Sequence, residues 1–240
     1  RIEGRPLRRD LQTAMGKIKY LCVEPHAGDL LMSACHVLVA PEYDVRVLTV
    51  DSDPKRVEEQ RQLCDFLGIA MDYLDLELED VRCSNFQSQC RDLSYEAVYT
   101  YLRSKYDSDG LNFAEQTLRD YLRKFMRRNP GYTLLAPLGA GHPFNQFIHD
   151  TVYDTASSAE YYRDFPYSYA SRGREQVRVQ CYNSENLLMK RRVSCDDMFD
   201  VKWELVIRFY PSLEATMDKY QRFIEQNPPE EIWYEGELPF

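Results

Sequence analysis

The sequence predicts an α/β domain in which helices cover both faces of a single, mostly parallel sheet. Two observations favour this class. Short apolar runs alternate along the chain with segments of helical length, which is the order expected for strands joined by crossover helices. The first run, residues 18–24, is mostly apolar and ends at Pro25, as is typical of a strand buried on both faces. Together they predict a three-layer, Rossmann-like architecture.

The first part of the chain supplies strands and helices in alternation. Strands are expected at residues 18–24, 44–51 and 71–76. Helices are expected at residues 30–38 and 54–67. The second helix has clear end signals, because Asp53 and Pro54 favour a helix start and Gly68 favours a helix end.

The rest of the chain continues this pattern and then departs from it. Helices are expected at residues 94–105, 112–128, 143–158 and 198–209, and strands at residues 133–137, 177–182 and 231–234. An aromatic stretch at residues 161–169 is compatible with a core segment, a platform for sugar rings, or contact with a second copy in a homo-oligomer. No repeat, low-complexity tract or linker divides the chain, so residues 15–240 are expected to form one domain.

Residues 1–14 are set apart from this domain. They contain Ile2-Glu3-Gly4-Arg5, which is typical of a protease site left by an expression vector. We interpret them as a vector-derived or disordered leader, with Met15 as the natural start.

The composition excludes several classes of protein. The 240 residues carry a net charge of -9 with an isoelectric point near 5.1, which argues against a general nucleic-acid-binding protein. No apolar run approaches the roughly 20 residues that a membrane span needs. The 7 cysteines include no Cys-x-x-Cys pair, which argues against a disulfide framework and a thiolate zinc site. A cytoplasmic location is therefore expected.

Histidines are scarce, and all 4 lie in two segments that begin at predicted strand ends. His26 follows the strand at 18–24, and His142 follows the strand at 133–137. Ligands of parallel α/β sheets bind beyond the carboxyl ends of the strands, and histidine is a common metal ligand and acid–base group. His26 and His142 are therefore candidate functional residues, whereas His36 is expected to be a buried or capping helix residue.

Five motifs follow one another along the chain. They are Pro25-His26-x-x-Asp29 with Ser33; Arg56-x-x-Glu59 with Leu67-Gly68; Ala136-Pro137-Leu138-Gly139-x-Gly141-His142; Tyr161-Tyr162-x-Asp164-x-Pro166-Tyr167; and Lys202…Tyr210-Pro211-Ser212 with Glu231-Ile232-Trp233. Each motif is weak to moderate by itself. In this order, over residues 18–234, they resemble the LmbE/PIG-L family of zinc-dependent N-acetylglucosaminyl deacetylase-like proteins.

The resemblance implies a hydrolytic zinc centre. In that family, a histidine and an aspartate of the first loop and a histidine of the second hold one zinc, with an open position for water. The first aspartate of the pair is the general base, and the leading histidine of the second loop stabilises the oxyanion. By position, His26 and Asp29 match two zinc ligands, and His142 matches the catalytic oxyanion-stabilising histidine.

Two key positions depart from the family pattern. Gly28 stands at the position of the general base and has no side chain to accept a proton. Asn145 stands at the third zinc-ligand position, and Phe144 replaces the aspartate before it. An amide oxygen is a poor substitute for imidazole on zinc. Because a positioned base contributes about 10²–10⁴-fold to rate, ordinary hydrolysis should be crippled. We expect zinc to be weakly bound or absent.

Other residues near these loops are candidates for substrate binding or for replacing the lost groups. Asp51, at the end of the second strand, is a candidate catalytic carboxylate, as is Glu24; a helix-capping role for Asp51 is an equally good interpretation. His149 lies roughly 6 Å beyond Asn145 along the helix axis and would miss the metal unless the helix shifts. The expected substrate-binding residues are Gly28, Ser33, Arg56 and His149.

The preferred hypothesis is a deacetylase-like protein with a degenerate zinc site, which retains a pocket for an N-acylated amino sugar or glycan derivative. One alternative is an active, divergent metal-dependent N-deacetylase that uses rearranged ligands. Another is a non-enzymatic protein that binds a partner through its aromatic stretch and acidic surface. A small-molecule or glycan ligand is thus favoured over nucleic acid or a membrane.

Overall fold

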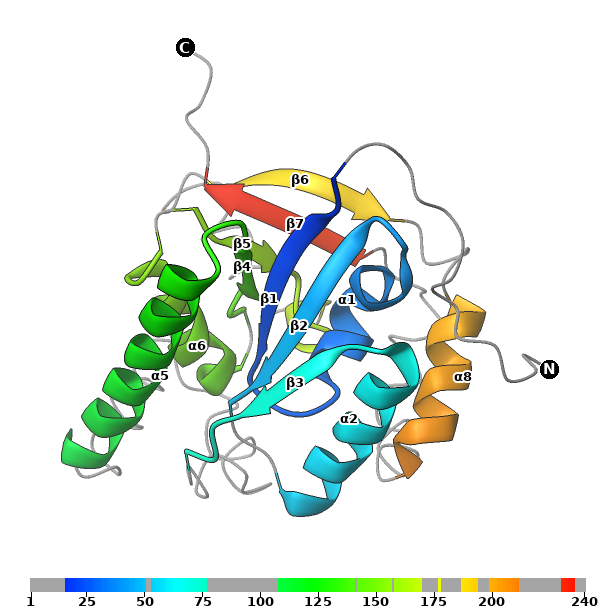
Figure 1. Cartoon of the computed structure of the whole chain (residues 1–240), viewed down its shortest axis with the longest axis horizontal. Helices are drawn as coiled ribbons and strands as arrows, with labels where there is room; N and C mark the ends of the chain where they lie inside the picture. Colours follow the sequence, from blue (N-terminus) through cyan, green and yellow to red (C-terminus); the bar gives the residue numbers. More distant parts are fainter. Residues whose placement is uncertain are drawn as a thin grey trace, which may run out of the picture.

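The computed structural model describes residues 16–50, 53–76, 108–140, 142–156, 158–169, 177, 187–193, 199–211 and 230–235. These residues form one seven-stranded sheet with the strand order β3-β2-β1-β4-β5-β7-β6. Helices lie on both sides of this sheet (Figure 1). The predicted three-layer α/β class is confirmed.

Most of the sheet is parallel. The parallel strands, in spatial order, are β3 (Ala70–Tyr73), β2 (Tyr43–Thr49), β1 (Ile18–Glu24), β4 (Thr133–Pro137) and β5 (Glu160–Tyr162). Two antiparallel strands complete the sheet. β7 (Glu230–Glu235) pairs with β5, and β6 (Leu187–Val193) pairs with β7 at the edge.

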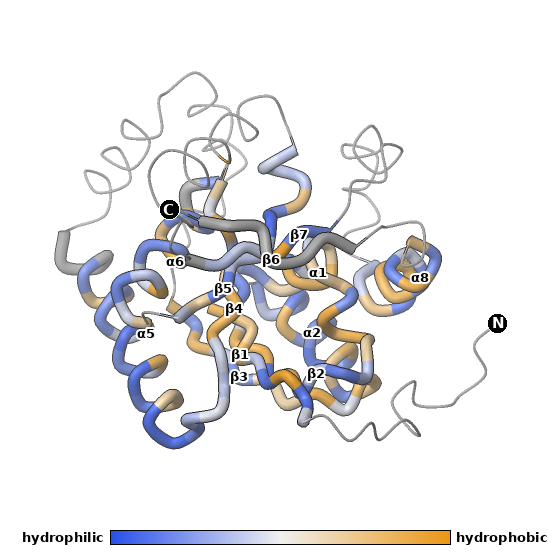
Figure 2. The backbone as a smooth tube through the Cα atoms, turned by 90° about the horizontal axis from the view of Figure 1, so that it is seen from above, coloured by the Kyte–Doolittle hydropathy of each residue, from blue (hydrophilic) through white to orange (hydrophobic). Residues whose placement is uncertain are grey.

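Side chains of β1 alternate between the two faces of the sheet, and each face has its own hydrophobic cluster. Tyr20 and Cys22 belong to one cluster, whereas Leu21 and Val23 belong to the other. The first cluster includes residues of α1 (Asp29–Val39), α2 (Pro54–Leu67) and α8 (Phe199–Phe209), and the second includes residues of α5 (Ser108–Arg128) and α6 (Pro143–Tyr153). Figure 2 shows hydrophobic residues along β1, β4 and α1, while the outer helix α5 is mostly hydrophilic.

The bounds of the elements differ from the prediction mainly at their ends. The segments at 18–24, 54–67 and 133–137 are confirmed without change. The start of α2 is fixed as predicted, because Asp53 Oδ1 accepts hydrogen bonds from Lys55 N and Arg56 N, both at 3.1 Å. α6 ends at Tyr153 rather than at residue 158, since the chain turns at Asp154.

The structure departs from the prediction at Val177 and at β6 (Leu187–Val193). Val177 is helical, so the strand predicted at 177–182 is wrong at that residue; residues 178–182 lie outside the described part of the chain, as does the helix predicted at 94–105. β6 has no counterpart in the prediction. The aromatic stretch forms β5 and a short 3-10 turn at Tyr167–Tyr169. Tyr161 and Tyr162 are 1% and 0% exposed, which supports the core interpretation for these two.

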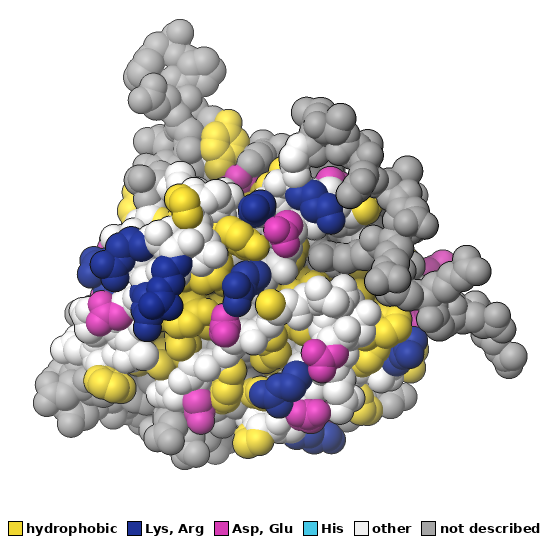
Figure 3. Space-filling view, in the orientation of Figure 1, with side chains coloured by type: hydrophobic (Ala, Val, Ile, Leu, Met, Phe, Trp, Pro, Cys, Tyr) yellow, Lys and Arg dark blue, Asp and Glu magenta, His cyan; other side chains and the backbone are white. Residues whose placement is uncertain are grey.

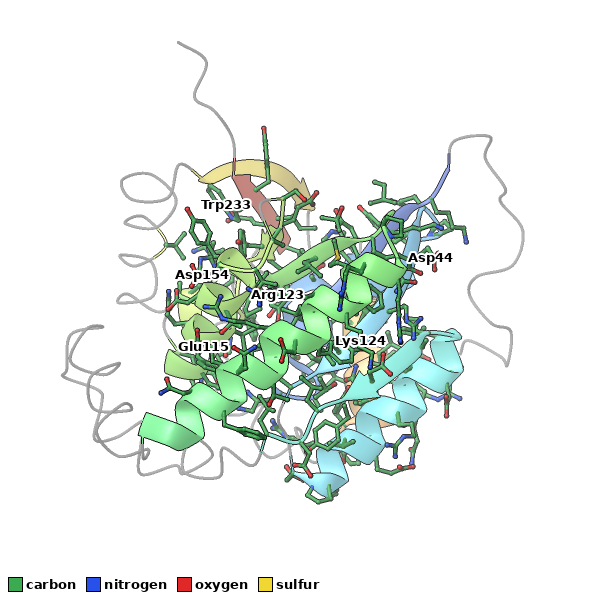
Figure 4. All side chains as sticks on the ribbon, turned by 60° about the vertical axis from the view of Figure 1, so that its left-hand side comes forward. Asp44, Glu115, Arg123, Lys124, Asp154 and Trp233 are labelled. Carbon is green, nitrogen blue, oxygen red and sulfur yellow. The ribbon has the colours of Figure 1, made fainter. Side chains whose placement is uncertain are left out.

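The described surface carries both signs of charge. On the face shown in Figure 3, acidic and basic side chains are interspersed. Arg119 on α5 pairs with Glu115 at 2.6 Å and with Asp154, after α6, at 2.7 Å, while Arg123 and Lys124 are exposed (Figure 4). Within the described ranges, no helix is both long and apolar enough to cross a membrane.

Candidate functional site

The loops after β1 and β4 and the segment after β5 meet where these adjacent parallel strands end. β1 has β2 on one side and β4 on the other, so successive strands are added in opposite directions from this point. Ligands of parallel α/β sheets bind in the crevice outside such a reversal. The imidazole rings of His26 and His142 lie together there, with centroids 5.7 Å apart. The predicted convergence of the two histidine-bearing loops is therefore confirmed.

His26 and Asp29 form a compact pair at the start of α1. Asp29 Oδ2 accepts a hydrogen bond from His26 N at 3.0 Å and lies 3.1 Å from His26 Nδ1. Burial alone would raise the pKa of Asp29, but the hydrogen bonds and charge of His26, with the charge of Arg56, lower it below its ordinary value. Asp29 is therefore an ionised carboxylate, and the positive charge of Arg56 helps to keep it ionised.

His142 directly precedes α6 and is 5% exposed. The centroid of its ring lies 4.7 Å from that of Tyr167, and the ring centroids of Phe144 and His26 are 5.0 Å apart. Burial, with the nearby charge of His26, lowers the pKa of His142 to about 3, so this imidazole is neutral near pH 7. Within the described residues, His142 Nδ1 has no hydrogen-bond partner. The side chain of Asn145 also acts on this ring, in the direction that raises its pKa, so His142 and Asn145 form one polar cluster.

The side-chain nitrogen of Asn145 is hydrogen-bonded within the protein. It donates a hydrogen bond to Asp164 Oδ1 at 2.8 Å. The other oxygen, Asp164 Oδ2, accepts from Ala140 N at 3.2 Å, and burial raises the pKa of this carboxyl to about 7. Asn145 Oδ1 lacks a hydrogen-bond partner among the described residues. Asp164 lies in one of the sequence motifs but is not among the predicted site residues. Its carboxyl group holds the amide nitrogen of Asn145 in place.

The donor set fits a zinc ion only in part. A hydrolytic zinc centre uses three protein ligands and an open position for water. His26 Nδ1 and Asp29 Oδ2, 3.1 Å apart, are spaced as two neighbouring ligands of one ion would be. The described part of the chain holds no group of three His, Cys, Asp or Glu side chains that could bind a metal. Among the described residues, His26 and Asp29 thus supply two of the three ligands that such a centre needs.

Gly28 serves the site through its backbone. Its φ of 94° and ψ of -12° lie in the left-handed region, where a side chain is costly. Its N–H donates to Gln60 Oε1 at 3.1 Å, and the Tyr210 hydroxyl donates to the same oxygen. These contacts fix the turn that brings His26 back to Asp29, and they give a conformational reason for glycine at this position.

Glu24, one of the candidate replacement carboxylates, is hydrogen-bonded to the backbone of α1 and to a side chain of β2. It is 0% exposed and accepts hydrogen bonds from Leu30 N at 3.1 Å and from the Thr49 hydroxyl at 2.7 Å. Burial raises its pKa to about 8. Glu24 therefore caps the first turn of α1, which has no side-chain cap at Gly28. Asp51, the other candidate, lies outside the described residues.

Ser33 and His149, two of the predicted substrate-binding residues, each contact another segment of the protein. Ser33 Oγ, on α1, accepts a hydrogen bond from Phe165 N at 3.0 Å and so ties α1 to the segment after β5. His149 is 0% exposed, with Nδ1 3.1 Å from Pro137 O and its ring 4.4 Å from that of Tyr161. The structure therefore does not bring His149 to the crevice with His26 and His142.

The second loop turns next to α6. Gly139 has a φ of 81°, and a Cβ there would lie 2.9 Å from both Gln146 Oε1 and His149 Cβ. A glycine is therefore required where the loop passes the helix, and this close approach places His142 at the helix start.

Searches for related proteins found the likeness in structure alone. No family model matches the sequence, and no curated protein matches it. A deacetylase of the teicoplanin biosynthesis pathway, solved in complex with teicoplanin, has a TM-score of 0.60 and 17% identity, and covers 90% of this chain and 97% of its own.

Two further structures agree with this likeness. The crystal structure of a deacetylase–bog complex from the same pathway has a TM-score of 0.56 and 16% identity, with 90% of this chain and 97% of that chain covered. The A40926 pseudoaglycone deacetylase Dbv21 has a TM-score of 0.57 and 13% identity, with 91% and 97% covered. At such low identity the likeness concerns architecture, and the chain has the fold of these deacetylases.

Proposed function

We propose that this chain is a deacetylase-like protein of the LmbE/PIG-L type with a degenerate zinc centre, and that it binds an N-acylated amino sugar or glycan derivative near His26 and His142. One observation carries the proposal. Asn145, at the position of the third zinc ligand, donates its amide to the buried Asp164 at 2.8 Å. This hydrogen bond holds the side chain in place, and the atom left for a metal is the amide oxygen, a poor substitute for imidazole on zinc.

The surroundings of the two histidines support a ligand of this kind. The neutral His142 ring can donate one hydrogen bond to an acyl carbonyl, and the Asp29 carboxylate can accept one from a hydroxyl or an amide N–H. The half-buried Tyr167 lies against the His142 ring, and an aromatic ring of this kind suits the apolar face of a sugar. The neighbours that share this fold are described as deacetylases, and one is bound to teicoplanin.

The proposal is tested by measuring binding and hydrolysis on one preparation. The probes are N-acetylglucosamine and a glucosamine with a longer N-acyl chain, followed by ligand-observed NMR and by acetate release with and without added zinc. We expect binding without hydrolysis, and about tenfold weaker binding in His142→Ala, since one direct hydrogen bond is lost. Gln116→Ala, at an exposed position of α5, is the control that should bind normally.

Two results would contradict the proposal. One is stoichiometric zinc together with acetate release by the unaltered protein. The other is probe binding that His142→Ala leaves unchanged. The double variant Gly28→Asp with Asn145→His asks the converse question, because it restores both family residues. If this double variant binds zinc and hydrolyses the probes, the scaffold of the zinc centre is intact and only the two substituted side chains are missing.

A second function, an active but divergent metal-dependent amidase, is favoured by the surviving pair of ligands. His26 and Asp29 are still 3.1 Å apart, and Asp29 is held ionised. Activity that requires both an added metal and His26 would support this alternative. Activity that persists unchanged in His26→Ala would exclude it.

We also propose a cytoplasmic location. Among the described residues, Cys22, Cys35 and Cys64 are buried cysteines outside any disulfide, a state that a reducing compartment maintains. Fractionation of the native source, with the chain detected by antibody, tests this, and recovery in an extracellular fraction would contradict it.

A further inference from the structure

Helix α1 carries two residues of the candidate site and is interrupted just after them. Asp29 is its first residue, and Ser33 directly precedes the interruption at Ala34, which has φ -146° and ψ 49°. These angles are far from helical values. The helix contains no proline or glycine that would explain the break. Such breaks also arise where a side chain is inserted into the backbone hydrogen-bond ladder.

Two charged side chains from distant parts of the chain occupy this break. In an uninterrupted helix, His36 N would donate to Met32 O, four residues earlier. Instead, Lys202 Nζ on α8 donates to Met32 O at 2.9 Å, and His36 N donates to Glu230 Oε2 on β7 at 2.9 Å. Lys202 and Glu230 also form an ion pair with each other. The pair therefore satisfies both backbone groups that the break separates.

The inserted carboxylate is deeply buried and multiply bonded. The side chain of Glu230 is 2% exposed, and its Oε2 also lies 2.5 Å from His36 Nδ1. Burial would raise the pKa of Glu230, but the charge of Lys202 and the bonds to His36 lower it to about 2. Because an unpaired buried charge is strongly unfavourable, the carboxylate is held in this one arrangement.

The residues on the amino-terminal side of the break reach both halves of the candidate site. Asp29 bonds to His26 in the first loop, at 3.0 Å from its backbone nitrogen. Ser33 accepts the N–H of Phe165, two residues before Tyr167, whose ring lies against His142. A change in the direction of α1 at Ala34 would therefore move the contacts of both imidazoles.

We propose that Lys202 and Glu230 are positioning residues of the candidate site: their ion pair holds α1 open at Ala34 and thereby sets where Asp29 and Ser33 lie. They act through the backbone of α1 and contact no ligand. This inference concerns the geometry of the site, so it stands or falls independently of the ligand proposed above.

The 4 histidines of the chain make the inference testable by NMR, because each ring gives a separate signal. Lys202→Met removes the cation, and Lys202→Arg preserves it. The double variant Lys202→Met with Glu230→Met removes both charges, and so leaves no unpaired buried ion if the single variant does not fold. Ile69→Ala is the matched control, because it removes core volume beside β3, at the opposite edge of the sheet from β7 and β6.

We expect the Cα shift of Ala34 to become helical in Lys202→Met and in the double variant, with displaced ring signals of His26 and His142. Lys202→Arg and Ile69→Ala should keep the native signals. His149, which faces Pro137 and Tyr161, serves as the internal reference. His36 contacts Glu230 directly and is not counted. An Ala34 shift that stays non-helical, or a helical Ala34 with unmoved His26 and His142 signals, would overturn the inference.

Discussion

Asn145 Nδ2 lies 2.8 Å from Asp164 Oδ1, and this contact joins the first turn of α6 to the segment after β5. Ala140 N, from the loop after β4, donates to the other oxygen of the same carboxyl group at 3.2 Å. A buried carboxyl with a raised pKa thus gathers three segments around His142. The hydrogen bonds of Asp164 therefore hold segments of the protein together. In a metal site, the corresponding side chains would bind the ion.

The first prediction concerns the strength of this contact. Asn145→Ala leaves the buried Asp164 with fewer donors, and we expect the free energy of unfolding to fall by about 1–3 kcal/mol. Urea denaturation measures it. Gln116→Ala is the matched control, since Gln116 makes the same amide–carboxylate bond to Asp120 at 2.8 Å in an exposed position. The control should change stability by less than about 0.5 kcal/mol, and equal effects would refute the structural role of Asn145.

The second prediction concerns the backbone at Gly28. A Cβ at φ 94° is strained, so Gly28→Ala should destabilise the protein by about 1–2 kcal/mol. Gly131→Ala is the control, because Gly131 is not among the glycines with positive φ and a Cβ there meets nothing within 4 Å. Thermal unfolding of the two variants side by side measures the difference. Equal stability would mean that the turn adopts another conformation.

The third prediction concerns the pH dependence of stability that Glu24 causes. Its pKa is about 8 in the folded protein, against an ordinary value of 4.5, so between these values the folded state binds more protons than the unfolded state. Stability should therefore fall as pH rises from about 4.5 to about 8, and Glu24 should add no further change above that.

Glu24→Gln removes this difference in proton binding between the folded and unfolded states, and it keeps the shape of the neutral acid. Unfolding measured between pH 5 and pH 8 should show a shallower loss of stability in this variant, by on the order of a few kcal/mol. Glu58→Gln, at an exposed position of α2, should leave the profile of the native protein in place. Parallel profiles for Glu24→Gln and the native protein would show that Glu24 is ionised at neutral pH.

The fourth prediction concerns the link between α1 and the aromatic segment. Ser33→Ala leaves Phe165 N without its acceptor in a buried position, and we expect a loss of about 1–3 kcal/mol of stability. Because Tyr167 follows closely, the ring signal of His142 should also move. Thr117→Ala, whose hydroxyl bonds to Phe113 O on the exposed side of α5, should leave that signal in place.

The sequence was sufficient to predict the elements whose bounds depend on residues close together in the chain. The strand before Pro25, the helix between Asp53 and Gly68, and the strand before Leu138 each carry their own start or end signals. The rule that strands and helices alternate then brings His26 and His142 to the same edge of the sheet. The fold and the location of the candidate site follow from these two facts.

What could not be predicted depends on contacts between distant residues. The interruption of α1 is formed by Lys202 and Glu230, which are 170 and 194 residues from their partners on the helix. The resemblance placed Asn145 at a ligand position, but its hydrogen bond to Asp164 depends on where β5 ends. Glu24 resembled a spare catalytic carboxylate because its sequence position does not reveal that Leu30 N and Thr49 bind it.

The strand order has a consequence for how the chain reaches its native state. β7 comes last among the described strands, yet it lies between β5 and β6. As the chain emerges from a ribosome, β5 therefore has an open edge and β6 has no native neighbour until residues 230–235 arrive. Unpaired edges of this kind expose nascent chains to aggregation, and long-range pairing slows folding. The same late strand brings Glu230, so the interruption of α1 is completed only when synthesis of this segment is complete.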